Sequence, residues 1–498
     1  MKLLLVQPSH IDRRGQVFKP SYLPYPGLAL PLIAALTPQD FDVEIVNDYA
    51  EDIDFDVPCD LVGITAMTPH AVRAYQIADQ FRARGRRVVM GGFHATNLPD
   101  HTSPHVDAIV MGEAENVWEE LIDDLKAGKL QDRYFSDKPA DLARLPTPRY
   151  DLLNGEHYAL RVFPVQATRG CPNKCDFCSV TKFYGGKYRF RPVADVVRDV
   201  KATGQRGTFF IDDNIAASTR YFMELCKALK PLNLIWGSQC SLKVGDKPEA
   251  LKAASEAGCF SLFLGMESLN PESLATVNKG FNKVADYERQ ITTIREAGIM
   301  PMVSMIFGFD GDDSRVFQQT YEFLMRMKIP MAHAFILTPP PGTRMFERLE
   351  DEGRMLSYDW SRYGGDETVF QPKRLSPEEL DAGLWETLSR YYSLSSIFRR
   401  LFVKDVLTSY KICIRSLIAL RFNLLHRRSL MRRVHPLRGA MGSSFLDFCI
   451  RSGMSDGRGK EGSPIKAPGP AEPVPEEGRG LSGFTQPSCP KAEGLGIS

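Results

Sequence analysis

The sequence has almost no net charge, no long apolar run and no dense set of paired cysteines. Its 62 Lys and Arg residues balance 61 Asp and Glu residues, so the field of the whole molecule gives no reason to expect a nucleic-acid partner. No apolar stretch reaches the ~18 residues of a membrane span. The N-terminal run is interrupted at Gln7 and Pro8 before the core of a signal peptide forms. These absences predict a cytoplasmic protein that does not bind nucleic acid.

Ten cysteines are too few for a disulfide scaffold in 498 residues, but three of them crowd together at Cys171, Cys175 and Cys178. In a reducing compartment such crowding indicates metal or cofactor ligation. The other seven are scattered and are expected to be small buried side chains or exposed tail thiols.

The length predicts two to four domains, taking roughly 150 residues for each. Within residues 1–135, short apolar runs alternate with helical patterns, as in a parallel sheet covered on both faces. The apolar runs are residues 3–6, 43–46, 61–66, 88–90 and 108–111. This pattern predicts a doubly wound, Rossmann-like α/β domain with a ligand crevice at the carboxyl ends of its strands.

A second α/β domain is expected over residues 161–370, after a linker at residues 136–160. Its six strand candidates are residues 164–168, 208–211, 234–238, 261–264, 302–307 and 334–337, each separated from the next by a helical stretch. Six such units predict a partial (β/α)6 barrel, open at one side, with its chemistry on the loops that follow the strands.

Residues 371–450 are expected to form a helical, basic C-terminal extension, with a helix start at Ser376-Pro377. Between Phe398 and Arg438 there are eleven Lys or Arg residues and one acid, Asp405, interleaved with apolar side chains. Such a segment can lie on an anionic membrane or dock on an acidic partner. The alternative is a set of helices that pack their apolar sides against the barrel. Residues 451–498 are too poor in apolar side chains to form a core and are expected to be disordered.

The three crowded cysteines lie on one tight loop directly after the first barrel strand candidate. Three thiolates satisfy three irons of a cubane cluster and leave the fourth iron open, whereas a structural zinc or a simple electron-transfer cluster ordinarily needs a fourth protein ligand. No fourth cysteine is near in sequence. The alternatives are a zinc site completed by a distant His or Cys, and a coincidence of buried thiols.

This CxxxCxxC pattern, with Phe177 directly before its third cysteine, resembles the signature of the radical S-adenosylmethionine (SAM) superfamily. The resemblance implies that Cys171, Cys175 and Cys178 hold a 4Fe–4S cluster whose open iron is chelated by SAM. An electron from the cluster then cleaves SAM to methionine and a 5′-deoxyadenosyl radical, which requires a low-potential donor such as flavodoxin or ferredoxin. The protein binds and orients the cofactors and excludes water.

Further positions match the same superfamily one at a time. The resemblance implies that Asp213 receives the methionine ammonium of SAM, and that Glu267 holds the ribose or methionine end. It also implies that Ser304 and Gly308 lie against the adenine and that Leu337 flanks that ring, although the superfamily's first glycine is Ser304 here. For each of these residues the alternative is a loop or cap role.

The first domain resembles the cobalamin-binding domain that precedes the barrel in many radical SAM enzymes. Its marks are the segment Pro24-Tyr25-Pro26-Gly27-Leu28, the strand end around residues 64–68, and Gly91-Gly92-Phe93-His94 followed by Gly112-Glu113. Glycines at strand ends let the backbone approach a bulky nucleotide loop. The resemblance implies bound cobalamin, with the crevice lined by Thr65, Met67, Gly91, Gly92 and His94.

The Asp-x-His-x-x-Gly motif that supplies a lower axial histidine in the wider cobalamin family is missing. Pro8-Ser9-His10 occupies the corresponding loop without the Asp or the spaced Gly. His10 is therefore expected to be a loop histidine, and His94 is expected to face the crevice without ligating metal.

The resemblance favours radical-based methylation of an unactivated carbon in a small-molecule or lipid substrate. The alternatives are a cyclisation or rearrangement without methyl transfer and, outside catalysis, an iron–sulfur electron carrier. The chain lacks the extra cysteine trio and the RNA-binding module of methylthiotransferases, so tRNA modification is not expected. The basic segment, with Phe402, Leu417, Ile418 and Phe422 among its arginines, predicts peripheral contact with the inner membrane surface.

Overall fold

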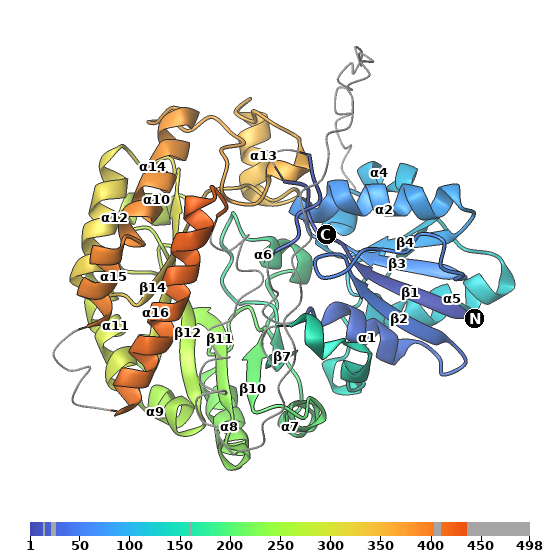
Figure 1. Ribbon diagram of the computed structural model, residues 1–498, viewed down its shortest axis with the longest axis horizontal. Helices are drawn as coiled ribbons and strands as arrows, with labels where there is room; N and C mark the ends of the chain where they lie inside the picture. The colour runs from blue at the N-terminus through green and yellow to red at the C-terminus, as the bar shows by residue number, and fades with distance from the viewer. Residues whose placement is uncertain (13–14, 21–25, 159–161, 403–409, 436–498) are drawn as a thin grey trace, which may run out of the picture. The chain divides into compact units, whose positions relative to one another are not determined.

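Two parallel six-stranded sheets form the framework of the chain (Figure 1). The computed structural model describes residues 1–12, 15–20, 26–158, 162–402 and 410–435. The tail expected to be disordered, residues 451–498, lies outside the described residues. Pro24 and Tyr25 also lie outside them.

The first sheet has the strand order β2-β1-β3-β4-β5-β6, and all its pairings are parallel. Leu3 and Leu5 pack against helices on one face, whereas Leu4 and Val6 pack on the opposite face, because successive side chains of a strand alternate. The expected doubly wound domain is confirmed. Its strands are β1 (Lys2–Gln7), β2 (Asp42–Asn47), β3 (Leu61–Thr65), β4 (Arg87–Gly91), β5 (Ala108–Met111) and β6 (Arg133–Phe135). Its helices are α1 (Ala29–Leu36), α2 (Ala71–Ala83), α3 (Phe93–Asn97), α4 (Pro99–Thr102) and α5 (Trp118–Ala127).

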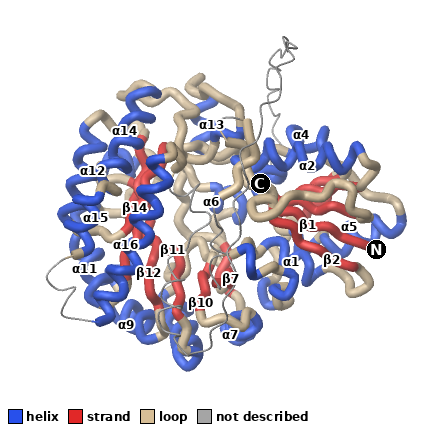
Figure 2. The backbone as a smooth tube through the Cα atoms, viewed as in Figure 1, coloured by secondary structure: helices blue, strands red, loops and turns tan. Residues whose placement is uncertain are grey.

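The second sheet has the strand order β14-β13-β12-β11-β10-β7 and is also parallel throughout. Its two edge strands do not pair with each other, so the sheet forms the expected partial, open (β/α)6 barrel (Figure 2). The strands are β7 (Val162–Val165), β10 (Gly207–Phe210), β11 (Ile235–Ser241), β12 (Cys259–Glu267), β13 (Met300–Phe307) and β14 (Met331–Ile336). The helices that follow them include α7 (Val193–Ala202), α8 (Thr219–Leu229), α9 (Pro248–Glu256), α10 (Pro271–Ala275), α11 (Tyr287–Glu296), α12 (Arg315–Arg326) and α13 (Arg344–Asp351).

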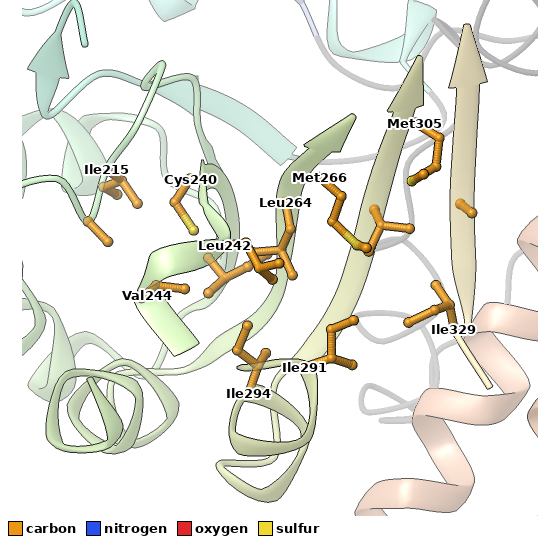
Figure 3. Packing of buried hydrophobic residues seen from close by; sticks show 14 of the residues in the cluster. Ile215, Cys240, Leu242, Val244, Leu264, Met266, Ile291, Ile294, Met305 and Ile329 are labelled. Atoms are coloured by element: carbon orange, nitrogen blue, oxygen red, sulfur yellow. The ribbon is translucent and has the colours of Figure 1, made fainter. Parts of the chain in front are cut away.

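A single apolar layer joins this sheet to its outer helices. Leu264, Met266 and Met305 from the strands meet Ile291 and Ile294 of α11 (Figure 3). Burial of each such side chain contributes about 1.5–3 kcal/mol. This layer fixes the strands whose carboxyl ends carry the candidate site.

The first barrel strand is shorter than the expected residues 164–168. It ends at Val165, and the chain continues as β8 (Thr168–Arg169), which pairs antiparallel with β9 (Arg189–Phe190). The cysteine loop and α6 (Ser179–Tyr184) lie between these two short strands. The loop is therefore closed at its base by β8 and β9.

The C-terminal extension is helical, as expected, and consists of α14 (Pro377–Tyr391), α15 (Leu394–Leu401) and α16 (Tyr410–Met431). The helix start at Ser376 is a capping box, because Ser376 and Glu379 each accept a hydrogen bond from the other's backbone N–H. The helix that starts there ends at Tyr391, and a new helix, α15, begins after Ser393, whose side chain caps it.

Helix α16 packs on the concave face of the second sheet. On β14, Ala332 and Ala334 face the outer helices, whereas Met331 and His333 face the other way. The His333 ring lies 5.3 Å from the ring of His426 in α16. Figure 1 shows α16 crossing in front of β12 and β14. None of the described helices combines the length and the apolar character needed to cross a membrane.

Candidate functional site

The three clustered cysteines occupy the loop between β8 and α6, and none of them forms a disulfide. Cys175 is buried and its carbonyl accepts a hydrogen bond from the Cys178 amide at 3.1 Å. Cys178 directly precedes the first turn of α6, and Asn214 Nδ2 lies 3.5 Å from Cys171 Sγ. The structure therefore brings the expected cluster ligands together on one loop with polar groups beside the sulfurs.

This donor set fits a cluster better than a single ion. Within the described ranges, no three His, Cys, Asp or Glu side chains converge closely enough to hold one metal ion. A cubane does not require this convergence, because each thiolate binds a different iron. Burial raises the pKa of the Cys175 thiol to about 12, an effect that the Lys279 ammonium opposes. Cluster binding must therefore release a proton from this site.

Two neighbouring carboxylates after β10 anchor the base of the cysteine loop. Asp212 accepts hydrogen bonds from the backbone and the hydroxyl of Thr168. Asp213 Oδ2 accepts one from the Gly170 amide at 2.9 Å. Gly170 has φ +84, and a Cβ there would lie 2.1 Å from the Lys187 carbonyl oxygen, so this position requires glycine.

Asp213, the residue expected at the SAM ammonium, lies beside the cluster loop. Burial raises the pKa of its carboxyl to about 6, although the Gly170 hydrogen bond and the Arg169 charge oppose the shift. A carboxylate that is costly to ionise in isolation gains most from a cation placed next to it. Its position and chemistry suit an ammonium ligand.

Glu267 ends β12 in a left-handed backbone conformation, φ +69, which is rare for a non-glycine residue. Its Oε1 lies 2.6 Å from Lys279 Nζ, while its buried Oε2 has no hydrogen-bond partner among the described residues. Gly265 makes room for the pair, because a Cβ at this position would lie 2.5 Å from Glu267 Oε1. Strain and an unsatisfied buried oxygen together are typical of a ligand site.

Lys279 was not anticipated from the sequence. Its buried ammonium lies 5.7 Å from the centre of the Phe177 ring, and although burial opposes the shift, the Glu267 carboxylate raises its pKa. Lys279 therefore connects the cysteine loop with the end of β12. No motif marks it, and only the three-dimensional contact reveals its place.

The remaining barrel positions separate into two groups. Ser304 pairs in register with Gly265 and lies on the same face as Met302, so it faces the concave side. Gly308 instead packs against α14, because a Cβ there would lie 2.8 Å from Leu380 Cδ2. Leu337 is buried in the layer behind the sheet. Packing accounts for the burial of Gly308 and Leu337, and their contact with the adenine stays a prediction.

A cavity of about 250 Å³ opens at the carboxyl ends of the first sheet. Its floor is apolar, with Leu5, Val89 and Trp118, and its rim includes Thr65, Gly91 and Gly92, as expected. Ligand pockets typically measure about 300–1,000 Å³, so this cavity suits one arm of a large cofactor. Gly92 has φ +96, and a Cβ there would lie 2.8 Å from the Ala66 carbonyl oxygen. An apolar slot under glycine-bearing strand ends fits the nucleotide-bearing arm of cobalamin.

The expectation that His94 faces the crevice is wrong. Its ring is fully buried, its Nε2 lies 2.7 Å from the Tyr75 hydroxyl, and burial lowers its pKa to about 3. The α3 helix turns His94 away from the cavity that Gly92 lines. Met67 is exposed beyond the end of β3 and also does not line the cavity. His10 is a buried loop histidine whose Nδ1 lies 3.1 Å from the Tyr49 hydroxyl.

The cavity and the cysteine loop share a wall. Arg169 lines the cavity and also lies two residues before Cys171. Its Nη1 lies 2.6 Å from Glu113 Oε1 and 2.8 Å from Glu115 Oε1, both on the first domain. Sequence reasoning missed this connection, because Arg169 lies on β8, whereas Glu113 and Glu115, 56 and 54 residues earlier, follow β5 of the first sheet.

Two family models match the chain. The model of the radical SAM superfamily matches residues 165–324, and the model of the B12 binding domain matches residues 20–122. The first match covers the cysteine loop and most barrel strands, and the second covers most of the first sheet.

Curated relatives are similar over most of the chain. Bacteriochlorophyllide d C-12(1)-methyltransferase of Chlorobaculum tepidum is 34% identical over 417 residues, which cover 80% of this chain and 89% of the relative. The anaerobic magnesium-protoporphyrin IX monomethyl ester cyclase of Cereibacter sphaeroides is 28% identical, over 68% of this chain and 61% of the relative.

Among solved structures, the fold resembles the radical SAM methyltransferase TsrM from Kitasatospora setae, determined with tryptophan and a SAM analogue. The TM-score is 0.61 at 18% sequence identity, and the match covers 87% of this chain and 98% of TsrM. This similarity covers both sheets and their connection.

Proposed function

Since the chain belongs to the radical SAM superfamily and carries a B12-binding domain, we propose that it methylates an unactivated carbon of its substrate. The protein is an enzyme whose cofactors are a 4Fe–4S cluster, SAM and cobalamin. The observation that carries the proposal is the common wall, Arg169, between the apolar cavity and the cysteine loop. The methyl transfer of the 34% identical relative supports it.

In this proposal Cys171, Cys175 and Cys178 hold the cluster, and residues 1–135 hold cobalamin. When bound, the cluster and SAM supply a 5′-deoxyadenosyl radical, and cobalamin supplies the methyl group. Asp213 attracts the SAM ammonium, and the free Glu267 oxygen accepts a hydrogen bond from SAM. In the same scheme, Phe177 and Ser304 are further candidates for contact with SAM.

The protein also controls access of water and solvent protons. The buried Glu267–Lys279 pair and the apolar layer behind β12 and β13 exclude water from the side of the site next to these strands. A dry site strengthens the electrostatic contacts to SAM and protects a reactive radical from side reactions. A low-potential protein such as flavodoxin or ferredoxin delivers the electron in this scheme.

A second candidate is a ring-forming reaction in which no methyl group is transferred. The 28% identity to a magnesium-protoporphyrin IX monomethyl ester cyclase favours this alternative over other radical reactions. The two candidates predict different products, because methylation adds one methyl group taken from SAM and cyclisation does not.

Reconstituted enzyme should be incubated with cell extract and methyl-labelled SAM, with a bacteriochlorophyllide-type macrocycle as the first pure probe. Methylation predicts label in a product heavier by one methylene unit than its precursor. An unlabelled product with a new ring would instead support cyclisation. A Cys175→Ala variant, treated in the same way, controls for label transferred without the cluster.

We further propose that α15 and α16 contact an anionic membrane surface. Ile418 and Phe422 are buried against the barrel, so the helix-packing alternative holds for them. Leu394, Phe398 and Phe402 instead form an exposed stripe on α15, at 47%, 50% and 45% exposure. Exposed arginines lie at 399 on α15 and at 421 and 428 on α16. An apolar stripe with basic neighbours suits a bilayer of anionic lipids.

Co-sedimentation with anionic liposomes tests this contact at low and at high salt. Binding should weaken as salt screens the charges, and both Phe398→Ser and the Arg427→Glu/Arg428→Glu variant should reduce it. Leu356→Ser, which removes an equally exposed apolar side chain outside these helices, should bind like the native protein. Native protein that stays in the supernatant at low salt would contradict the contact and point to a soluble substrate.

A further inference from the structure

An ion cluster around Arg169 connects the base of the cysteine loop with the segment that follows β5 of the first sheet. Arg169 Nε and Nη2 bond to Gln166 Oε1 at 3.1 and 3.0 Å, while Nη1 pairs with Glu113 and Glu115. Arg189 Nη2 also contacts Glu113 Oε1, at 2.8 Å. Every guanidinium nitrogen of Arg169 therefore has a partner.

Charge balance makes the cluster a rigid connection. The buried Arg169 and the half-buried Arg189 face two carboxylates, and both guanidinium groups lie over the Tyr184 ring, at 6.0 and 5.7 Å. Although burial alone would raise the pKa of Glu113, the Arg189 hydrogen bond and the Arg169 charge hold it below its usual value. Removal of one buried partner leaves an uncompensated charge, so the pairs hold one another in place.

Arg169 is also connected to the cysteine loop, through its two neighbours in the chain. The Thr168 hydroxyl donates to Asp212 and the Gly170 amide donates to Asp213, so both chain neighbours of Arg169 are anchored. Gly170 has no free space, because the Lys187 carbonyl lies against it. A backbone shift at Arg169 would therefore also move the Gly170 amide, and with it Asp213 or the cysteine loop.

We propose that Arg169 is a positioning residue that couples occupancy of the cobalamin cavity to the SAM site. A ligand in the cavity contacts the wall formed by Glu113, Glu115, Arg169 and Tyr184. Ordering of this wall fixes Arg169, which in turn fixes Gly170 and the Asp213 carboxylate. Binding of cobalamin and binding of SAM then strengthen each other by the same factor, as linkage requires. The inference rests on the cofactor set of the proposed function but not on its substrate or on methyl transfer.

The test measures two affinities in the full-length, cluster-loaded protein without any substrate. The dissociation constant of a SAM analogue is determined with and without hydroxocobalamin, and the two values give a coupling ratio. The dissociation constant of hydroxocobalamin, measured with and without the SAM analogue, should give the same ratio. We expect a ratio of about fivefold or more in the native protein. Arg169→Lys keeps the charge but loses the planar fork, and Glu113→Gln keeps the shape but loses the charge. In both variants the ratio should fall toward one.

Arg289→Lys serves as the matched control, because Arg289 forms an exposed ion-pair cluster with Asp246 and Asp286 on the outer helices. Its ratio should equal the native ratio. The electron paramagnetic resonance signal of the reduced cluster, recorded with and without cobalamin, is a second measurement. If Arg169 only stabilised the fold, cobalamin would not change this signal. A native ratio of one, or an unchanged ratio in a folded Arg169→Lys or Glu113→Gln protein, would overturn the proposal. Failure of cobalamin to bind at all would instead contradict the proposed function.

Discussion

The Glu267 carboxylate lies 2.6 Å from the Lys279 ammonium inside the barrel, and its second oxygen has no partner in the described chain. The pair balances its own charge and still leaves one acceptor directed at the site. This arrangement suits a residue that must be ionised and available in a dry environment.

Lys279→Met should destabilise the fold, because it leaves the Glu267 charge buried without its cation. The expected loss is about 3–5 kcal/mol in unfolding free energy, measured by guanidinium denaturation. Glu267→Gln combined with Lys279→Met should recover part of this loss, since no charge is then buried. A double variant as unstable as the single Lys279→Met variant would show that the two groups are not coupled.

Replacement of any one clustered cysteine should abolish SAM cleavage. In Cys171→Ala, Cys175→Ala or Cys178→Ala, two thiolates remain, and they cannot hold a cubane with one open iron. Cluster absorbance and 5′-deoxyadenosine production are the measurements. Cys59→Ala, which changes a buried thiol in the loop before β3, should retain both. Production of 5′-deoxyadenosine by any of the three variants would refute the ligand assignment.

Affinity for SAM should depend on pH through Asp213. Burial raises the pKa of this carboxyl to about 6, so it is protonated at lower pH and cannot attract the ammonium. Affinity should therefore rise as pH increases through about 6 and level off above it. Asp213→Asn should bind more weakly and without this step.

Asp312→Asn is the control for that experiment. Burial also raises the Asp312 pKa to about 6, but its partners are Ser273 and the amides of Gly308 and Phe309. The pH step should persist in this variant. A step that disappears in Asp312→Asn and persists in Asp213→Asn would reverse the assignment.

Filling the cavity of the first domain should prevent cobalamin binding. Ala114 lies on the cavity wall, and Ala114→Trp should weaken binding about tenfold or more, which corresponds to ~1.4 kcal/mol. Absorbance titration of the full-length protein measures this effect. Ala127→Trp, at the exposed end of α5, should bind cobalamin normally. Equal affinities of the two variants for cobalamin would show that cobalamin does not bind in this cavity.

Local sequence patterns predicted helices and strands well where the spacing of apolar residues matches the side chains that are buried in the structure. The strand at residues 108–111 matches β5, because four apolar residues lie between turn-forming neighbours. The helix start at Ser376 follows from the Ser-to-Glu spacing of a capping box. The cysteine loop was identified because its ligands are close in sequence.

Other features depend on contacts that no local pattern encodes. His94 follows two glycines at a strand end, yet α3 rotates its ring toward Tyr75. Gly308 is a glycine because Leu380 fills the space beside it. Lys279 and Arg169 have partners on other elements, and their roles emerge only when the strands are brought together.

The position of α16 also determines when the barrel can be completed during synthesis. Domains generally fold from the N-terminus as the chain emerges from the ribosome. The apolar and histidine side chains on the concave face, such as Met302 and His333, receive their cover from residues 418–426. Until those residues emerge, a nascent chain with all six strands exposes this face to water and to other chains. A translation stop before α16 should therefore yield an aggregating product rather than a smaller active enzyme.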